Sequence, residues 1–196
     1  MRGQGLVEEI KTLEQIELEE KTVAAGLAYA HAVKVTERSI EDYLGRVESF
    51  PCRVDGIIAW RVDAGGDLYN CLKARILKDE AYPAYIPGMV GTVRRASIAY
   101  YLTEKKQFHI NMVATPTGLE LVSGSGTVSL EEGKLMPHIH VVVADHTGNA
   151  YGGHLFPGTV VKEYVEGLLL KLKGVRFERR YSEEIKTTKL RFIPET

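Results

Sequence analysis

The sequence predicts an α+β protein in which a small helical unit precedes a larger, strand-rich domain. Residues 1–50 contain no proline and repeat apolar side chains at three- and four-residue spacing, which is typical of helices. After Pro51, short apolar runs rich in β-branched and aromatic residues are separated by Gly and Pro, which is typical of strands joined by turns. A length of 196 residues accommodates one domain of this kind and a smaller appendage.

Two apolar stripes define the helical unit. The stripes are Leu6, Ile10, Leu13 and Ile16, then Ile40, Tyr43, Leu44, Val47 and Phe50. Pro51 ends this pattern, because a proline disfavours helix at the residue before it. We therefore predict an all-α unit over residues 1–50.

The remainder of the chain is expected to form mostly strands. We predict strands at residues 56–62, 96–102, 119–123, 126–130, 138–143 and 175–179. A helix is predicted from Asp67 to about Asp79, with Leu68, Leu72, Ile76 and Leu77 on one face. The segment from Glu163 to Lys173 is compatible with a strand or with a short helix.

The charge balance excludes two classes of protein. Lys and Arg number 25 and Asp and Glu 26, which gives a formal net charge of -1 and a pI near 6.6. This balance excludes a uniformly basic nucleic-acid-binding surface and an acidic disordered tail. The sum hides an asymmetry, since residues 1–50 hold six basic and ten acidic residues and carry −4, while the remainder carries +3.

The cysteines and the N-terminus predict a cytoplasmic protein. Cys52 and Cys71 form no Cys-x-x-Cys pair, so we expect neither a disulfide framework nor a cysteine zinc site, and a reducing compartment is the default. Glu8 and Glu9 stand where a signal peptide would need an apolar run. The longest uncharged stretch, 146–161, is rich in Gly and contains two His and a Pro, so we expect no membrane span.

Histidines are concentrated in one part of the chain. His138 and His140 lie two residues apart on a predicted strand, so their side chains share a face of the sheet. A hairpin turn at residues 145–149 would return the chain antiparallel and bring His154 back toward His140, with Gly152 and Gly153 allowing a close backbone approach. Three imidazoles arranged in this way can bind one Zn²⁺ and leave a fourth position open.

A simpler interpretation of these histidines is also open. They can be ordinary hydrogen-bonded strand residues with no metal between them. His146 is assigned to the turn and to solvent, while His31 and His109 have no identifiable partners and are interpreted as structural.

The histidine and glycine cluster resembles the PPC family (plants and prokaryotes conserved domain, also called DUF296). The resemblance is carried by Pro137-His138-x-His140 with its hydrophobic strand, and by Gly152-Gly153-His154-Leu155. Gly118-Leu119-Glu120-Leu121-Val122-Ser123 is also similar to the family. So is the stretch 88–101, in which a Gly-x-x-Gly turn (Gly88, Gly91) is expected before a long strand. The similarity covers about residues 52–182, which leaves a C-terminal strand or tail at 183–196.

The resemblance implies a fold, an assembly and a site. It implies an antiparallel α+β domain with one or two helices that assembles as a homotrimer. It implies a zinc site at His138, His140 and His154, and it leaves room for a small-molecule effector. Plant members carry AT-hooks before the domain, but this chain has no Arg-Gly-Arg-Pro core, so binding of the DNA minor groove by an AT-hook is not expected.

The helical unit is similar to a helix-turn-helix. Ala30 would allow two helices to cross closely, Val35 would fill the turn, and Thr36 would cap the second helix. The candidate DNA-binding residues are Lys34, Thr36, Arg38, Ser39 and Arg46.

Two features oppose DNA binding by this unit. Lys34 stands where such a turn usually has Gly, and a left-handed Lys costs roughly 1–2 kcal/mol. The presumed recognition helix, Glu37–Ser49, holds four acidic residues and two arginines, although affinity for DNA depends largely on phosphate neutralisation. A trimer also matches palindromic half-sites poorly, because paired sites reflect two-fold symmetry. A helical extension that mediates protein contacts is the alternative.

Three functions are therefore compatible with the sequence. The first is a DNA-binding, transcription-regulator-like protein whose PPC-like domain trimerises and binds a metal or small ligand. The second is a zinc-dependent enzyme that uses the open coordination position, for which Glu120 and Asp145 are candidate general bases. The third is a trimeric scaffold without site chemistry, and the sequence favours a protein that is not an enzyme.

Overall fold

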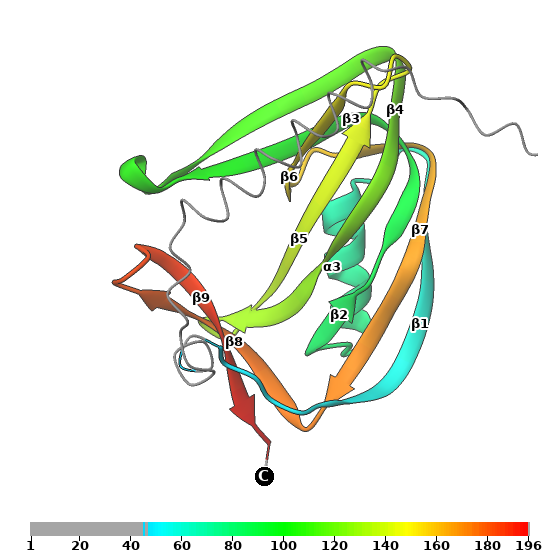
Figure 1. The fold of residues 1–196 in the computed structure, drawn as a ribbon. Helices are drawn as coiled ribbons and strands as arrows, with labels where there is room; N and C mark the ends of the chain where they lie inside the picture. The colour runs from blue at the N-terminus through cyan, green and yellow to red at the C-terminus, as the bar shows by residue number, and fades with distance from the viewer. Residues whose placement is uncertain (1–44, 46, 196) are drawn as a thin grey trace, which may run out of the picture. The chain divides into compact units, whose positions relative to one another are not determined.

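The computed structural model describes Gly45 and residues 47–195, which include all of the strand-rich domain (Figure 1). The five candidate DNA-binding residues and most of the expected helix-turn-helix lie outside the described residues. The described end of the expected helical unit, residues 47–50, is not helical, and Val47 of its apolar stripe is 63% exposed. Within the described part of the chain, no helix has the length and apolar character needed to cross a membrane.

Nine strands make up one mostly antiparallel sheet, as the predicted α+β class requires. The strands are β1 (Arg53–Asp63), β2 (Ala84–Ile86), β3 (Met89–Leu102), β4 (Gln107–Glu131), β5 (Lys134–Ala144), β6 (Ala150–Leu155), β7 (Val160–Lys173), β8 (Val175–Ser182) and β9 (Thr187–Pro194). Only the contact between β4 and β8 is parallel among the named strand pairs. One α-helix, α3 (Leu68–Lys78), and one 3₁₀ turn, η1 (Thr103–Lys105), complete the described elements.

The sheet closes on itself. Its order is β1-β7-β3-β6-β5-β4-β8-β9, and β3 also pairs with β4, so the ladder from β3 through β6 and β5 returns to its start. The short strand β2 pairs with both β4 and β7. Figure 1 shows the resulting curved sheet, with α3 against one face. Closure satisfies backbone groups that an open edge would leave unpaired.

The helix α3 begins and ends close to the predicted residues. Asp67 caps its N-terminus by accepting a hydrogen bond from the backbone N–H of Asn70 at 2.9 Å, and the other carboxylate oxygen accepts from the N–H of Gly158 at 2.7 Å. Asp79 is the C-cap residue. One carboxylate therefore both starts the helix and ties it to the loop before β7.

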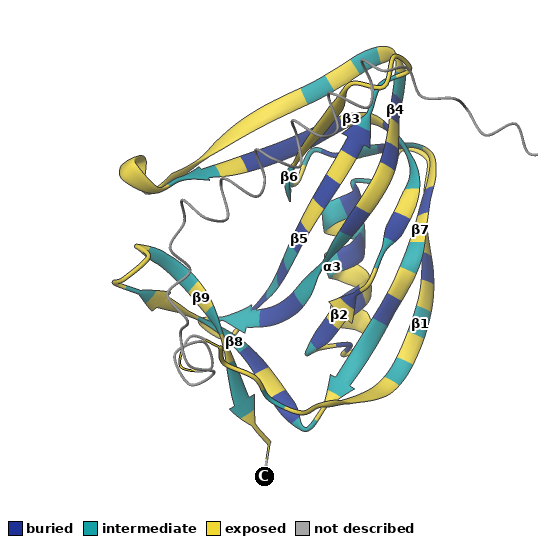
Figure 2. Cartoon of the chain, viewed as in Figure 1, coloured by how far each residue is buried: buried dark blue, intermediate teal, exposed yellow. Residues whose placement is uncertain are grey.

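The apolar core lies on the face of the sheet that carries α3. Along β5 the odd-numbered residues from Leu135 to Val143 are buried, while the even-numbered residues are intermediate or exposed. Figure 2 shows this alternation as bands of contrasting colour along the strand. From the helix, Leu68, Leu72 and Ile76 join the same core. His138 and His140 therefore point to the opposite face.

Three details of the predicted elements differ from the structure. Leu77 is 51% exposed rather than buried, because it lies about 100° around the helix from Ile76, at the edge of the apolar stripe. The two strands expected at 119–123 and 126–130 are parts of one strand, β4, which is irregular but unbroken between Leu121 and Ser123. Gly91, expected in a turn, lies inside β3.

Other open or partial predictions are resolved. The segment from Glu163 to Lys173 is strand, within β7, and the predicted strand after Val175 is β8. The residues after 182 contain a further strand, β9. Both cysteines are free, with Cys52 exposed and Cys71 half-buried.

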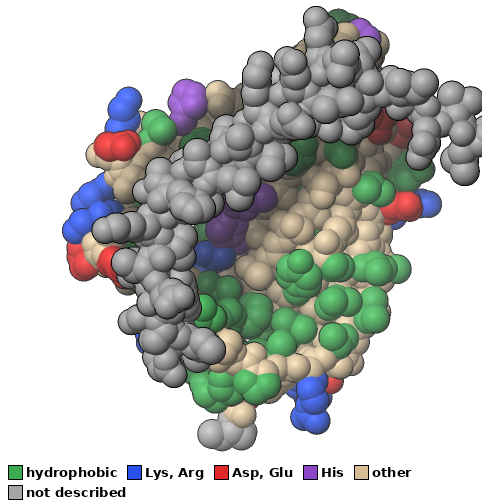
Figure 3. Space-filling view, viewed as in Figure 1, with side chains coloured by type: hydrophobic (Ala, Val, Ile, Leu, Met, Phe, Trp, Pro, Cys, Tyr) green, Lys and Arg blue, Asp and Glu red, His purple; other side chains and the backbone are tan. Residues whose placement is uncertain are grey.

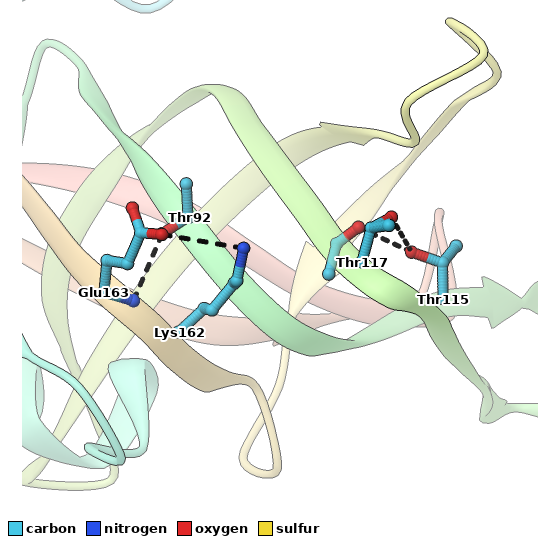
Figure 4. A network of polar contacts seen from close by, with 6 residues as sticks. Thr92, Thr115, Thr117, Lys162 and Glu163 are labelled. Carbon is cyan, nitrogen blue, oxygen red and sulfur yellow. Dashed lines mark hydrogen bonds and ion pairs between the residues drawn. The ribbon is translucent and has the colours of Figure 1, made fainter.

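Two groups of polar contacts lie on neighbouring strands outside the core (Figure 4). The hydroxyl of Thr92 on β3 accepts a hydrogen bond from the backbone N–H of Glu163 on β7 at 3.2 Å. On β4 the hydroxyl of Thr115 donates to the carbonyl oxygen of Gly118 and lies 3.3 Å from the hydroxyl of Thr117. These contacts satisfy polar groups where the ladders of β3 with β4 and β7 shift register.

The two glycines before His154 have different packing environments, which gives a matched pair of variants. A methyl group at Gly153 would lie 2.8 Å from the carbonyl oxygen of Ala99 and closer still to Ile98, whereas one at Gly152 would meet nothing nearer than 3.3 Å. We expect Gly153→Ala to lower the free energy of unfolding by about 1–3 kcal/mol, because strand β3 must move to admit the methyl group. Gly152→Ala should change it by less than about 1 kcal/mol. Urea unfolding of both variants measures the difference, and equal effects would contradict this packing.

Candidate metal and ligand site

Three histidines converge on the face of the sheet opposite to the core. His138 and His140 share a face of β5 because they are two residues apart. The turn at Asp145–Asn149 returns the chain as β6, and its register places His154 directly opposite His140. Figure 3 shows histidine side chains together in a hollowed part of this face, with a basic side chain against them.

The turn between β5 and β6 is built by Asp145. Its carboxylate accepts hydrogen bonds from the backbone N–H groups of Thr147 and Asn149 and from both of their side chains. These hydrogen bonds hold the pKa of Asp145 well below its usual range, with the Thr147 side chain as the largest cause. His146 lies in this turn and is exposed, as predicted. The turn chemistry therefore sets the return path that delivers His154.

Glycine at two positions allows the strands to approach closely. At Gly126 on β4 an added Cβ would clash with the carbonyl oxygen of His138 and with the backbone of Ile139 on β5. At Gly153 it would clash with Ile98 and Ala99 on β3. The expected role of Gly153 in close backbone approach is confirmed, and the two contacts hold β5 and β6 in place around the histidines.

The donor atoms of the three imidazoles fit a single metal ion. Each histidine offers a ring nitrogen within 4.8 Å of the other two, and Nε2 of His138 lies 3.0 Å from Nε2 of His140. Nitrogens bound tetrahedrally to one Zn²⁺ at 2.0–2.1 Å would be separated by about 3.3 Å. Within the described residues this is the one group of three metal-ligating side chains that converges in this way.

The electrostatic environment keeps these rings neutral. Burial lowers the pKa of His138 to about 3, with a further contribution from Arg179. Burial lowers the pKa of His154 to about 4, with His140 as the next cause. The pKa of His140 is also lowered, by burial and then by Arg179. Neutral imidazole is the form that binds a metal, so no proton has to leave at neutral pH.

Aromatic side chains line one side of the cluster. The ring of Phe108 meets His154 edge-on at a centroid distance of 5.3 Å, and Phe156 lies 4.9 Å from Phe108. Tyr101 packs edge-on against Phe108 at 5.2 Å on the paired strand. These rings remove water from the His154 side and fix the orientation of its imidazole.

The structure adds one charged residue that the sequence analysis missed. Arg179 on β8 is half-buried and affects the pKa of all three histidines. The sequence contains a signal for this position, because Arg179 follows Val175 and Phe177 at two-residue spacing on a predicted strand, so all three share a face. In the structure Val175 and Phe177 are buried. A charge in an inward register position of a strand is unusual and often marks a functional site.

The two candidate general bases do not join the cluster. Both carboxylate oxygens of Asp145 are occupied within its turn. Glu120 is exposed on β4 opposite Ala144, whereas the residues of β4 opposite the histidines are Ser125 and Thr127. Neither carboxylate provides the proton acceptor that a hydrolytic site of this kind needs.

The fold and the histidine cluster define a known class of domain. The family described as the Plants and Prokaryotes Conserved (PCC) domain matches residues 51–173, and the chain belongs to this family. The predicted resemblance is thus confirmed for the strand-rich domain. No curated protein matches the chain.

Several solved structures are similar to the domain. A metal-containing protein from Archaeoglobus fulgidus is 31% identical, with a TM-score of 0.64, over 76% of this chain and 100% of that one. A plant- and prokaryote-conserved protein from Pyrococcus horikoshii is 27% identical, with a TM-score of 0.64, over 72% and 96% of the two chains. A protein from Ralstonia eutropha JMP134 that is proposed to bind DNA is 22% identical, with a TM-score of 0.61, over 68% and 89%, and supports the fold alone.

The lowered pKa values predict how acid affects the metal-free protein. Below pH 6.5 the unfolded chain protonates its imidazoles, whereas His138 and His154 in the folded chain stay neutral down to about pH 3 and pH 4. The unfolded state then binds more protons, so stability falls as the pH is lowered from about 6.5 to about 4. In His138→Asn this decrease should be shallower.

Urea unfolding of the metal-free variants at several pH values between 4 and 8 measures this effect. Parallel curves for His138→Asn and the unchanged chain would contradict the neutral cluster.

Proposed function

We propose that this protein is a DNA-binding, transcription-regulator-like protein whose PCC domain holds a zinc ion through His138, His140 and His154. The single observation that carries the metal site is the convergence of three neutral imidazoles, with ring nitrogens within 4.8 Å of one another. Metal binding is supported further by the Archaeoglobus fulgidus relative, which contains metal.

Zinc is the metal proposed because of the donor set. Three neutral nitrogen ligands without a carboxylate or thiolate suit Zn²⁺ and leave a fourth position open for water or a small ligand. The open coordination position would lie beside the aromatic rings of Phe108 and Phe156, and such a surface is suited to binding a small effector. In this proposal the bound metal or ligand stabilises the domain and so regulates the rest of the protein.

A homotrimer is proposed as the assembly. Its support is a row of exposed apolar side chains on the long hairpin of β3 and β4, which extends away from the rest of the domain in Figure 1. The members of this row are Phe108, Ile110 and Met112, which alternate along one face of β4 and are each at least 41% exposed. A contiguous apolar surface of this kind is typical of a protein–protein contact.

Binding of DNA is proposed for residues 1–50. Its support is the helix-turn-helix-like pattern, with Lys34, Thr36, Arg38, Ser39 and Arg46 as the contacts. Three basic side chains would supply the phosphate contacts that a unit carrying −4 otherwise lacks.

Elemental analysis of the purified protein tests the metal site. We expect about one zinc per chain, and a loss of zinc affinity on the order of 100-fold or more in His140→Ala, since even groups that only orient a ligand contribute 10–100-fold. His140 is exposed, so its removal should leave the fold intact. The matched control is His146→Gln, an exposed histidine outside the cluster, which should retain full metal content. Equal zinc in both variants would overturn the site.

Fluorescence anisotropy with duplex DNA tests the proposed binding of DNA by residues 1–50. We expect binding that weakens with salt and is lost when residues 1–50 are deleted. In the full chain, Arg38→Ala should reduce the slope of log K against log salt by about 1, because one phosphate contact is lost. Arg176→Ala, an exposed arginine on β8, serves as the control and should leave the slope unchanged. Full binding by the truncated protein would exclude residues 1–50 as the DNA-binding unit.

A further inference from the structure

Arg179 reaches the histidine cluster from a strand that lies beyond the matched family domain. It lies on β8, which runs parallel to β4 and pairs Arg179 with Glu131. Its Nη2 lies 3.5 Å from the hydroxyl oxygen of Thr127. Thr127 is the register partner of His138, and directly opposed residues of an antiparallel pair point to the same face with Cβ atoms about 4.5–5.5 Å apart. The guanidinium therefore lies on the histidine face, next to His138.

This guanidinium has no anionic partner among the described residues. Its Nε is inaccessible to solvent and makes no hydrogen bond. The ion pairs of β8 are made by Arg176 and Arg180, both with Glu178. Burial lowers the pKa of Arg179, while the charge of Glu131 acts in the opposite direction. An arginine nevertheless stays protonated in proteins, so a positive charge and an unused donor remain in the site.

The charge balance of a loaded site is unfavourable without an anion. The three histidines are not acidic ligands and bring no negative charge to compensate a divalent cation. A bound dication next to Arg179 would concentrate like charges in a partly desolvated hollow, where their repulsion is stronger than in water. An anion placed between the metal and the guanidinium would compensate both positive charges.

We propose that this site is a receptor for a small oxyanion, a carboxylate or a phosphoryl group, which is held by the guanidinium of Arg179. The metal-loaded form of the receptor rests on the proposed function, since the oxyanion would then also occupy the open position of the ion. A guanidinium suits this task because its planar N–H donors match the two oxygens of a carboxylate or phosphate. The class of effector is thereby narrowed to small anionic molecules.

Isothermal titration calorimetry on the full chain tests the proposal with acetate and with methylphosphonate as probes. Each probe is titrated into the metal-free protein and into the zinc-loaded protein. We expect binding of at least one probe, tighter in the loaded protein, and the tighter probe identifies the source of the oxyanion as carboxylate or phosphoryl. Arg179→Gln should weaken that binding at least about tenfold, since hydrogen bonds to charged groups contribute this much.

The matched control is Arg180→Gln, which removes an exposed arginine of the same strand that is already paired with Glu178. It should change the affinity by less than about twofold. Zinc content separates the two proposals, because Arg179→Gln should keep its zinc and lose only the anion. If the protein binds no zinc, the titration of the metal-free protein still measures whether Arg179 binds the anion.

Circular dichroism shows whether Arg179→Gln folds. If it does not fold, a second variant tests the same proposal. Arg179→Lys keeps the charge but loses the planar pair of donors, and we expect it to weaken the anion about tenfold. Unchanged affinity in either folded Arg179 variant would overturn the proposal. So would the absence of binding by both probes to the unmodified protein in both metal states.

Discussion

The structure depends on the register of β5 between its two neighbours. Gly126 on β4 lies where any side chain would collide with β5, and Gly153 on β6 lies where any side chain would collide with β3, so the strands approach closely at both places. In that register the odd-numbered residues of β5 enter the core, and His138 and His140 point to the other face. A slip of one residue would exchange the two faces and send the histidines into the apolar core. The same constraint therefore specifies both the core and the site.

Burial of the histidine face is electrostatically unfavourable. Three imidazoles and a guanidinium are crowded into a partly buried hollow, and burial disfavours the charged form of each imidazole. Such an arrangement is stabilising only when a ligand fills it, because a metal replaces missing protons and an anion compensates the cations. Selection for folding alone would have replaced these groups by apolar side chains of similar size. The cluster is therefore the part of the domain that a bound ligand would stabilise most.

Two other parts of the protein, the hairpin of β3 and β4 and residues 1–50, are suited to functions other than metal binding. The hairpin of β3 and β4 offers exposed apolar side chains suited to protein–protein contacts, while its Phe108 also lines the site. Assembly and ligand binding would then share a structural element, which provides a physical route for one to influence the other. The uneven charge of the chain, −4 before residue 51 and +3 after it, agrees with separate roles for the two parts.

Much of the domain could be predicted from local sequence patterns. The helix at 67–79, the strands near the histidines, and the return of His154 to His140 all follow from periodicity, turn residues and a two-residue strand repeat, which act over short distances along the chain. Leu77 and the continuous strand β4 were predicted less well, because the edge of an apolar stripe and the span of a Gly-containing strand depend on which neighbours pack against them.

The sequence by itself therefore determined the family, the α+β class and the three histidines. Tertiary structure alone decided that the rings lie within contact distance and stay neutral, since burial depends on the whole sheet. It alone brought Arg179 to Thr127, 52 positions earlier in the chain, through the parallel pairing of β8 with β4. No local pattern reports a contact between strands so far apart, because loops of variable length and direction join them.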